Sequence, residues 1–488
     1  MKQDDEFVTT ASVSPRVTVP SVVMVDGVPD SELAKSTGPT MAGLLPLASR
    51  PPTRAQNLQV IYLAVAFAVL FTAFNVAQTF LTTLHATSGF ASLGMVYGTF
   101  AVGSLIAPAL GPYFGVKRAL FCSSIAYVVF VAAAQESTPS WLLLLASAWE
   151  GLSGGLMWIF QGVWLALITE QGGSPGYFSG LFFTIFSFNG VAGNAIALIA
   201  LLNDVDIATL LWMLFVIGAI GSVMIYFMAD VKGSERVLQD KRSVSDILRT
   251  VRDAMSDPNV WLLSGYFSVQ GVGLSFSFGN YPTLLQGDKP LVCGVFLCYG
   301  VASCVAAFVS GKVFDKVGAR PIVILHVILV IFNFVMIFAL TTGGGDSSFS
   351  NMPARKALFA LGGAVFGVID NLSNSINNMT IIELFSANSA PLFAGYRFVF
   401  CIGFTIAAAL SMGLGTITMM VFTFLWLCMA AVCYFWLRIR ISNEVTLKAL
   451  QRAAAPDTPG GFDDAVASSP LPSAPSRTVS GEIELEEV

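Results

Sequence analysis

The chain is poor in charge, in histidine and in paired metal ligands. Only 11% of its 488 residues are Asp, Glu, Lys or Arg, whereas soluble domains carry roughly 25%. This shortage excludes an ordinary soluble enzyme. Lys and Arg form no basic patch, so we expect no nucleic-acid partner. The two histidines, His85 and His326, are far apart and no cysteines have zinc-ligand spacing, so we expect no metal and no cofactor.

Long apolar runs are abundant instead, since 55% of the residues are hydrophobic. A membrane-spanning helix needs about 20 apolar residues. The first six such runs lie near 58–84, 92–110, 119–135, 141–169, 178–202 and 209–229. The second six lie near 260–280, 291–310, 322–342, 357–385, 392–414 and 417–437. We therefore predict an all-α, polytopic protein of the lipid bilayer with about twelve transmembrane helices.

Polar segments divide the chain into five predicted parts. These are a disordered tail (1–56), a six-helix bundle (57–229), a central loop (230–258), a second six-helix bundle (259–439) and a second tail (440–488). Lys and Arg gather in the central loop and beside every second span, as cytoplasmic loops do. We therefore expect both termini in the cytoplasm, while the plasma membrane and an internal membrane both stay open. The amphipathic stretch 243–255 indicates either a helix at the membrane surface or a linker helix.

A short repeat connects the two groups of spans. Residues 108–118 (PALGPYFGVKR) and 311–321 (GKVFDKVGARP) each follow the second span of a group. Gly115 of the first copy corresponds to Gly318 of the second, and Lys117 corresponds to Arg320. Internal duplication of this kind places a site between two halves in many transporters.

The second copy resembles the loop signature of the major facilitator superfamily, through Gly311, Asp315, Gly318 and Arg320. In that superfamily the loop is a latch. The glycines permit a tight turn, and Asp315 can form ion pairs that break when the two halves rock. Pro112 stands at the corresponding position of the first copy, so the first half cannot form the same latch. An ordinary charged turn at the cytoplasmic surface is the alternative interpretation.

Five ordered motifs of the first half resemble the uncoordinated-93-like branch of that superfamily. They are FNVAQTFL (74–81), SLGMVYG (92–98), SLIAPALGPYFGVKRAL (104–120), GGLMWIFQGVWL (154–165) and GLFFTIFSFNGVAGNAI (180–196), with GGAVFGVIDNLSNSI (362–376) as the best match in the second half. The branch includes regulatory subunits of potassium channels and proteins that escort innate immune receptors. The resemblance therefore implies either a transporter or an auxiliary protein that has a membrane-protein partner.

Polar side chains inside four spans are the candidates for function, because a polar group within a bilayer is costly. They lie on the first, fourth, seventh and tenth spans, which line the central cavity in the superfamily that this chain resembles. The candidate set is Asn75, Gln78, Glu150, Gln161, Gln270, Asp370 and Asn374. For a single residue, hydrogen bonding between neighbouring helices is the alternative explanation.

Glu150 and Asp370 are the most informative members of this set. A carboxyl group at this depth, with no Lys or Arg beside it, should take up a proton or bind a cation. The lack of deep positive charge disfavours an anionic substrate. We predict a secondary transporter that moves a cationic or neutral small solute by alternating access, with proton coupling as one option. A non-transporting auxiliary protein for a channel or receptor is the alternative. We do not expect an enzyme, because no nucleophile and base share one depth.

Overall fold

Helices make up nearly all of the chain that the structure describes. The structure is a computed structural model and describes residues 51–454, apart from 174, 240–242, 286, 318, 343–352 and 386–388. The first helices are α1 (Arg54–Phe114), α2 (Val116–Ala133), α3 (Ser140–Thr169), α4 (Pro175–Phe186), α5 (Phe188–Leu202) and α6 (Ile207–Tyr226). The later ones are α7 (Ser234–Gln239), α8 (Val244–Met255), α9 (Pro258–Ser275), the π-helix η2 (Phe276–Asn280), α10 (Tyr281–Thr283), α11 (Lys289–Val317), α12 (Ala319–Thr342), α14 (Pro353–Leu384), α15 (Ser389–Ser411) and α16 (Thr416–Ala454).

The long helix α1 doubles back on itself and crosses the membrane twice. Ala86 has φ 45° and ψ −120°, which is not helical and reverses the chain. The side-chain nitrogen of Gln78 lies 3.3 Å from the hydroxyl oxygen of Tyr97, whereas a straight helix would separate these residues by about 28 Å. Residues 54–85 and 87–114 are therefore two antiparallel arms, which we call the first and second arms of α1.

The described residues contain twelve membrane crossings. Ten helical stretches are long and apolar enough to span a bilayer. One of these, α1, crosses twice, and α9 with η2 and α10 forms a further crossing. This confirms the predicted all-α fold with about twelve spans. The helix α16 continues to Ala454, so residues 440–454 are helical, where the sequence analysis had expected a disordered tail.

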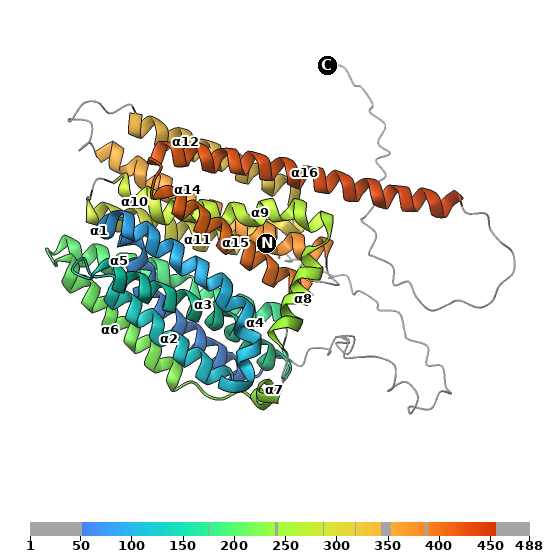
Figure 1. Cartoon of the computed structure of the whole chain (residues 1–488), viewed down its shortest axis with the longest axis horizontal. Coiled ribbons are helices and arrows are strands. Elements are labelled where there is room, and N and C mark those ends of the chain that lie inside the picture. The colour runs from blue at the N-terminus through green and yellow to red at the C-terminus, as the bar shows by residue number, and fades with distance from the viewer. Residues whose placement is uncertain are drawn as a thin grey trace, which may run out of the picture. The chain divides into compact units, whose positions relative to one another are not determined.

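The helices gather in two bundles, α1 to α6 and α9 to α16 (Figure 1). The second arm of α1 meets α15, where the ring of Tyr97 stacks on Phe404 with 3.6 Å between centroids. On the other side α5 meets α11, and a Cβ atom at Gly300 would lie only 3.0 Å from the carbonyl carbon of Gly190. The two halves therefore touch through a flat ring stack and through a backbone contact that only small residues permit.

Glycines bring two helices into backbone contact inside each half. In the first half, Cβ atoms at Gly151 and Gly155 of α3 would overlap the carbonyl oxygens of residues 96 and 100 in the second arm of α1. In the second half, Cβ atoms at Gly363 and Gly367 of α14 would overlap the carbonyl oxygens of residues 295 and 299 in α11. Small residues four positions apart allow such close approach between membrane helices.

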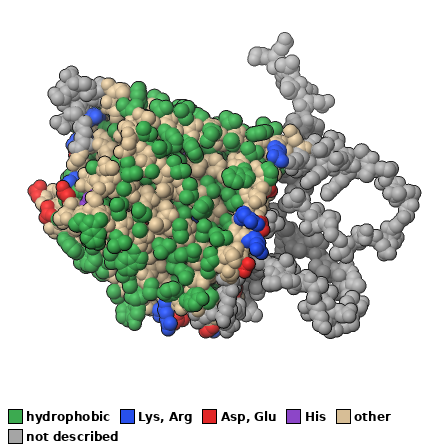
Figure 2. Space-filling view, viewed as in Figure 1, with side chains coloured by type: hydrophobic (Ala, Val, Ile, Leu, Met, Phe, Trp, Pro, Cys, Tyr) green, Lys and Arg blue, Asp and Glu red, His purple; other side chains and the backbone are tan. Residues whose placement is uncertain are grey.

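The surface of the molecule fits a membrane environment. Figure 2 shows hydrophobic side chains over the middle of the face in view and charged side chains at its edges. Exposed apolar residues such as Trp212, Val301 and Leu425 belong to this outer surface. Lipid tails can cover such an apolar surface, whereas its exposure to water would be unfavourable.

The connecting helix α8 packs on the bundle through one face. Ile247, Val251 and Met255 are half-buried at a spacing of four residues, while Arg249 and Arg252 are exposed. Met255 contacts Gly395 of α15. We therefore favour the linker helix over a helix that lies on the membrane surface.

Candidate functional site

Asp370 on α14 is the centre of a polar network in the second half. The Tyr299 hydroxyl of α11 donates to its Oδ2 atom at 2.9 Å. The side-chain nitrogen of Gln270 on α9 donates to its Oδ1 atom at 3.3 Å. Each carboxyl oxygen thus receives one donor from a different helix, and these dipoles replace part of the solvation that water would supply.

Tyr396 of α15 extends the network to a fourth helix. Its hydroxyl group contacts the side-chain oxygen of Gln270 and lies 3.1 Å from the side-chain oxygen of Asn374. A phenol has one proton, so it can donate to only one of these two amides at a time. Three candidates from the sequence, Gln270, Asp370 and Asn374, therefore lie together, and their hydrogen bonds offer more than one arrangement.

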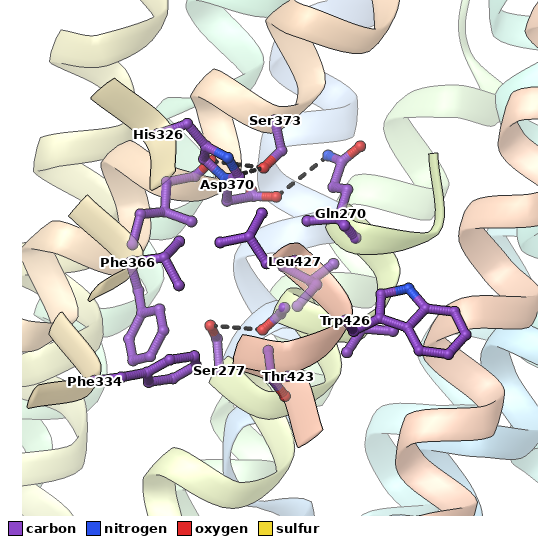
Figure 3. A pocket seen from close by; sticks show the side chains of 16 residues that line it. Gln270, Ser277, His326, Phe334, Phe366, Asp370, Ser373, Thr423, Trp426 and Leu427 are labelled. Atoms are coloured by element: carbon purple, nitrogen blue, oxygen red, sulfur yellow. Dashed lines mark hydrogen bonds between the residues drawn. The ribbon is translucent and has the colours of Figure 1, made fainter. Parts of the chain in front are cut away.

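A small cavity touches this network. Its volume is about 30 Å³, and it lies between α9, α12, α14 and α16. In Figure 3 the side chains of Asp370, Gln270, His326 and Ser373 lie at one end of the cavity, and Phe334 and Phe366 lie farther along its wall. The cavity therefore has one polar end, built around the carboxyl group, and a mainly apolar remainder.

Glu150 is the buried acid of the first half and has a different environment. Its side chain is 1% exposed, and its Oε2 atom has no hydrogen-bond partner among the described residues. Its hydrogen-bonding neighbour is the hydroxyl group of Tyr127 on α2. The Tyr127 ring in turn packs against Phe71 and Phe74 of α1, at 4.9 Å between centroids in each case. Glu150 thus lies beside an aromatic cluster and not within a polar network.

The other candidates of the first half have local partners or none. Asn75 donates to the side chain of Asn189 on α5, and Gln78 donates to the Tyr97 hydroxyl. The side-chain nitrogen of Gln161 is buried and has no partner among the described residues. The structure therefore does not bring all seven candidates into one cluster, and their role in binding stays a prediction.

Tyr97 is the residue that links the two acids. It belongs to the second arm of α1, stacks on Phe404 of the other half, and interacts electrostatically with the carboxyl groups of both Glu150 and Asp370. Neither acid forms an ion pair with a described Lys or Arg residue. The contact surface between the two halves thus lies near two carboxyl groups that form no ion pair with a described basic residue.

The predicted latch is described only in part. Gly318 and the side chain of Asp315 lie outside the described residues, Gly311 belongs to α11, and Arg320 is exposed at the start of α12. In the first copy, Gly115 has φ 67°, a backbone conformation that favours glycine.

Lys117 of the first copy has its own ion-pair partner. Its Nζ atom lies 4.0 Å from the carboxylate of Asp230, just after α6. Lys117 therefore bridges two helix ends without an acid at position 112. The gating role of both copies stays a prediction.

The sequence analysis missed the tyrosines and considered His326 only in the argument against a metal site. Tyr97, Tyr127, Tyr299 and Tyr396 supply hydroxyl groups to the network and to its neighbours. All four lie in apolar runs of the sequence. Their spacing from the acids along the chain gives no signal, because each lies on another helix. Among the described residues, no three His, Cys, Asp or Glu side chains gather as metal ligands.

Comparison with known proteins gives a consistent result. A family model described as ion channel regulatory protein UNC-93 matches residues 81–435. UNC93-like protein MFSD11 of Xenopus laevis is 26% identical over 405 residues, which cover 73% of this chain and 90% of that protein. UNC93-like protein 3 of Arabidopsis thaliana is 26% identical over 277 residues, which cover 51% of this chain and 59% of that protein.

Among solved structures, the crystal structure of the nucleoside transporter NupG is similar to this chain. The TM-score is 0.60 at 13% sequence identity, and the match covers 78% of this chain and 98% of NupG. An identity this low concerns the fold alone. It confirms the predicted major facilitator fold.

Proposed function

The chain belongs to the UNC-93 family, and we propose that it is a secondary transporter that moves a small cationic or neutral solute by alternating access, with protons as the coupling ion. The observation that carries this proposal is the environment of Asp370. Its carboxyl group accepts hydrogen bonds from Tyr299 and Gln270, borders a cavity and forms no ion pair with a described Lys or Arg residue. Such a group can bind and release a proton as its surroundings change.

The contact between the two halves supports the rocking motion. Tyr97 stacks on Phe404 on one side, and Gly190 meets Gly300 on the other. Both contacts can separate without breaking an ion pair. A rigid rotation of one bundle against the other is the motion by which this fold alternates access.

The charge near the acids supports the choice of solute. Glu150 and Asp370 add negative charge in their ionised forms, and no described Lys or Arg lies within ion-pair distance of either acid. An anionic solute would meet repulsion in this region, whereas a cation or a neutral solute would not.

The test begins with a screen of small amines, cations and neutral polar solutes for thermal stabilisation of the purified protein. Compounds that stabilise it are then tested for uptake into proteoliposomes with and without a pH gradient. We expect the gradient to drive uptake by the wild type and not by Asp370→Asn. Asn371→Ala is the matched control, because the Asn371 side chain accepts from Ser310 on α11 and not from the Asp370 network. Gradient-driven uptake by Asp370→Asn at the wild-type rate would contradict the proposal.

An auxiliary role is the second candidate, and the description of the matching family model as an ion channel regulatory protein favours it. Pro112, which replaces the latch acid in the first copy, also fits a scaffold that no longer rocks. Affinity purification from native membranes distinguishes the two functions. A stoichiometric channel or receptor, together with no flux of any stabilising solute, would support the auxiliary role.

We further propose that both termini face the cytoplasm. The start of α1 lies beside the end of α3, where the side chain of Gln56 donates to the carbonyl oxygen of Ile168. Lys117 pairs with Asp230 at this same end, and the side chain of Gln171 reaches the carbonyl oxygen of Lys232. Lys117 and Lys232 therefore lie at one end of these helices, and the positive-inside rule places the end with more Lys and Arg in the cytoplasm.

A further inference from the structure

A second titratable side chain lines the cavity beside Asp370, and the proposed function leaves it unused. His326 of α12 is fully buried. Its Nδ1 atom lies 2.6 Å from the Tyr266 hydroxyl of α9, and its Nε2 atom lies 2.8 Å from the Ser373 hydroxyl of α14. Ser373 follows Asp370 by three residues, so both side chains lie on one face of α14. Figure 3 shows His326, Ser373 and Asp370 together at the polar end of the cavity.

We propose that His326 shares a proton with Asp370 through one water molecule in this cavity. The volume of about 30 Å³ is sufficient for about one water molecule, which needs two to four polar partners. Asp370, Ser373 and Gln270 line the polar end and can supply them. The inference rests on the proposed function, in which Asp370 binds the coupling proton.

The hydroxyl group of Ser373 can connect the water to the imidazole ring. It donates its single proton either to the carbonyl oxygen of Ile369, at 3.0 Å, or to the Nε2 atom of His326. In the second case the neutral imidazole carries its proton on Nδ1 and donates it to Tyr266. A rotation of one hydroxyl group therefore opens or closes the connection.

Proton transfer along this connection balances. The carboxyl proton of Asp370 passes to the water, the water passes a proton to the Ser373 oxygen, and Ser373 passes its own proton to Nε2. Asp370 ends as a carboxylate and His326 as an imidazolium, while the water and Ser373 are unchanged. The product is an ion pair within one cavity, so no isolated charge is left in the membrane interior.

The other titratable groups around the pair favour this direction or do not interfere. Tyr266 of α9 packs on Tyr434 of α16, with 5.4 Å between ring centroids, and Tyr299 of α11 is bonded to Asp370. Free phenols lose their protons only near pH 10, so these groups stay neutral. Arg397 of α15 stays positively charged and interacts electrostatically with Asp370. It therefore stabilises the carboxylate that remains after the transfer.

The test observes the ring nitrogens of His326 by NMR, which is feasible because the chain has few histidines. The chain contains only His85 and His326, so the variant His85→Asn with ¹⁵N-labelled histidine gives an NMR spectrum of His326 alone. This full-length His85→Asn protein is titrated with pH in nanodiscs. The same titration is then made on double variants that also carry Asp370→Asn, Ser373→Ala or Asn371→Ala. The thermal unfolding midpoint of each variant shows whether it is folded.

We expect the His326 nitrogen signals of the parent to move with pH, and this movement to be lost in Asp370→Asn and in Ser373→Ala but kept in Asn371→Ala. Signals that stay fixed in the parent, or that move equally in Asp370→Asn, would overturn the inference. The experiment needs no solute. Loss of coupled uptake in Asp370→Asn with unchanged His326 signals would refute the shared proton and leave the proposed transporter intact.

Discussion

The two halves hold their helices together in the same way but place different chemistry on that frame. Gly151 and Gly155 of α3 meet the second arm of α1, and Gly363 and Gly367 of α14 meet α11. The spacing is four residues in each helix, and the carbonyl oxygens that they meet, at positions 96 and 100 and at positions 295 and 299, are also four residues apart. This match indicates that both halves derive this glycine contact from one duplicated pattern.

The residues that follow this pattern differ between the halves. Asp370 stands three positions after the second glycine of α14, and Trp158 stands three positions after the second glycine of α3. Tyr299 donates to Asp370, and its carbonyl oxygen meets the second glycine of α14. Phe100 is the corresponding residue of the first half, because its carbonyl oxygen meets the second glycine of α3. Trp158 packs among phenylalanines, including Phe71 at 5.4 Å between ring centroids. One half therefore holds a hydroxyl and a carboxyl group where the other holds two aromatic rings.

The polar network around the acid that we propose to bind the coupling proton lies in the second half, while the first half is mainly packed aromatic side chains. Glu150 is the exception, and it does not occupy the position of Asp370. It precedes the first glycine of α3, where the second half has Gly362.

The glycine contacts should be equally important in both halves. Alanine at position 155 or 367 would place a methyl group against a backbone carbonyl oxygen that cannot move independently. We expect each change to destabilise the protein by about 1–3 kcal/mol or more, measured as a lower thermal unfolding midpoint. Gly162→Ala on α3 and Gly294→Ala on α11 are the controls, because no atom lies within 4 Å of an added Cβ there. Equal stability of Gly155→Ala and Gly162→Ala would show that the glycine contact between α3 and α1 does not stabilise the protein.

Asp370 and Tyr299 should be energetically coupled. In Asp370→Asn only one of the two side-chain acceptors remains. If the amide oxygen accepts from Gln270, the amide nitrogen faces the Tyr299 hydroxyl group and cannot accept its hydrogen bond. We expect a loss of about 1–3 kcal/mol, and Tyr299→Phe in the same background should restore part of it. A double-mutant cycle on unfolding free energies should therefore give a coupling of about 0.5–3 kcal/mol. Additive effects would mean that the hydroxyl and carboxyl groups do not interact.

Glu150 should respond in the opposite direction. Its Oε2 atom has no donor among the described residues, so Glu150→Gln removes a poorly solvated carboxyl group of nearly the same shape. We expect the free energy of unfolding to stay constant or to rise by at most about 1–3 kcal/mol. The thermal unfolding midpoint should therefore not fall. A clear fall in the midpoint would show that Glu150 belongs to a polar network like that of Asp370.

The smallest effect is expected at the contact between the halves. Tyr97→Phe keeps the ring stack on Phe404 and removes only the hydrogen bond from Gln78. Hydrogen bonds between membrane helices contribute about 0.6 kcal/mol on average, so the unfolding midpoint should barely change. Tyr97→Ala, which removes the stack as well, should lower it further. Equal effects of both changes would show that the stack does not stabilise the contact.

Much of the fold was predictable because membrane spans are read from local hydrophobicity. The fourth span was expected at 141–169 and is α3, Ser140–Thr169. The end of α16 was not predictable in this way, since residues 440–454 mix polar and apolar side chains and their helix continues beyond the apolar run. Hydrophobicity marks where the chain lies in lipid, and it does not mark where a helix ends outside it.

The candidate site was predictable only in its acids and amides. Asp370, Gln270 and Asn374 stand out as polar residues in apolar spans. Tyr299 and His326 reach Asp370 and its cavity from other helices, and their roles depend on packing between segments that are distant in sequence. A tyrosine in an apolar run looks the same whether its hydroxyl group meets lipid headgroups or a buried carboxyl group.

The most direct test of proton coupling at Asp370 is the movement of protons during transport. A pH-sensitive dye inside proteoliposomes reports this movement when a stabilising solute is added outside. We expect the wild type and Glu150→Gln to change the internal pH as the solute enters, and Asp370→Asn to bind the solute without any change. A solute-dependent pH change of the same size in Asp370→Asn would contradict the assignment of the coupling proton to this residue.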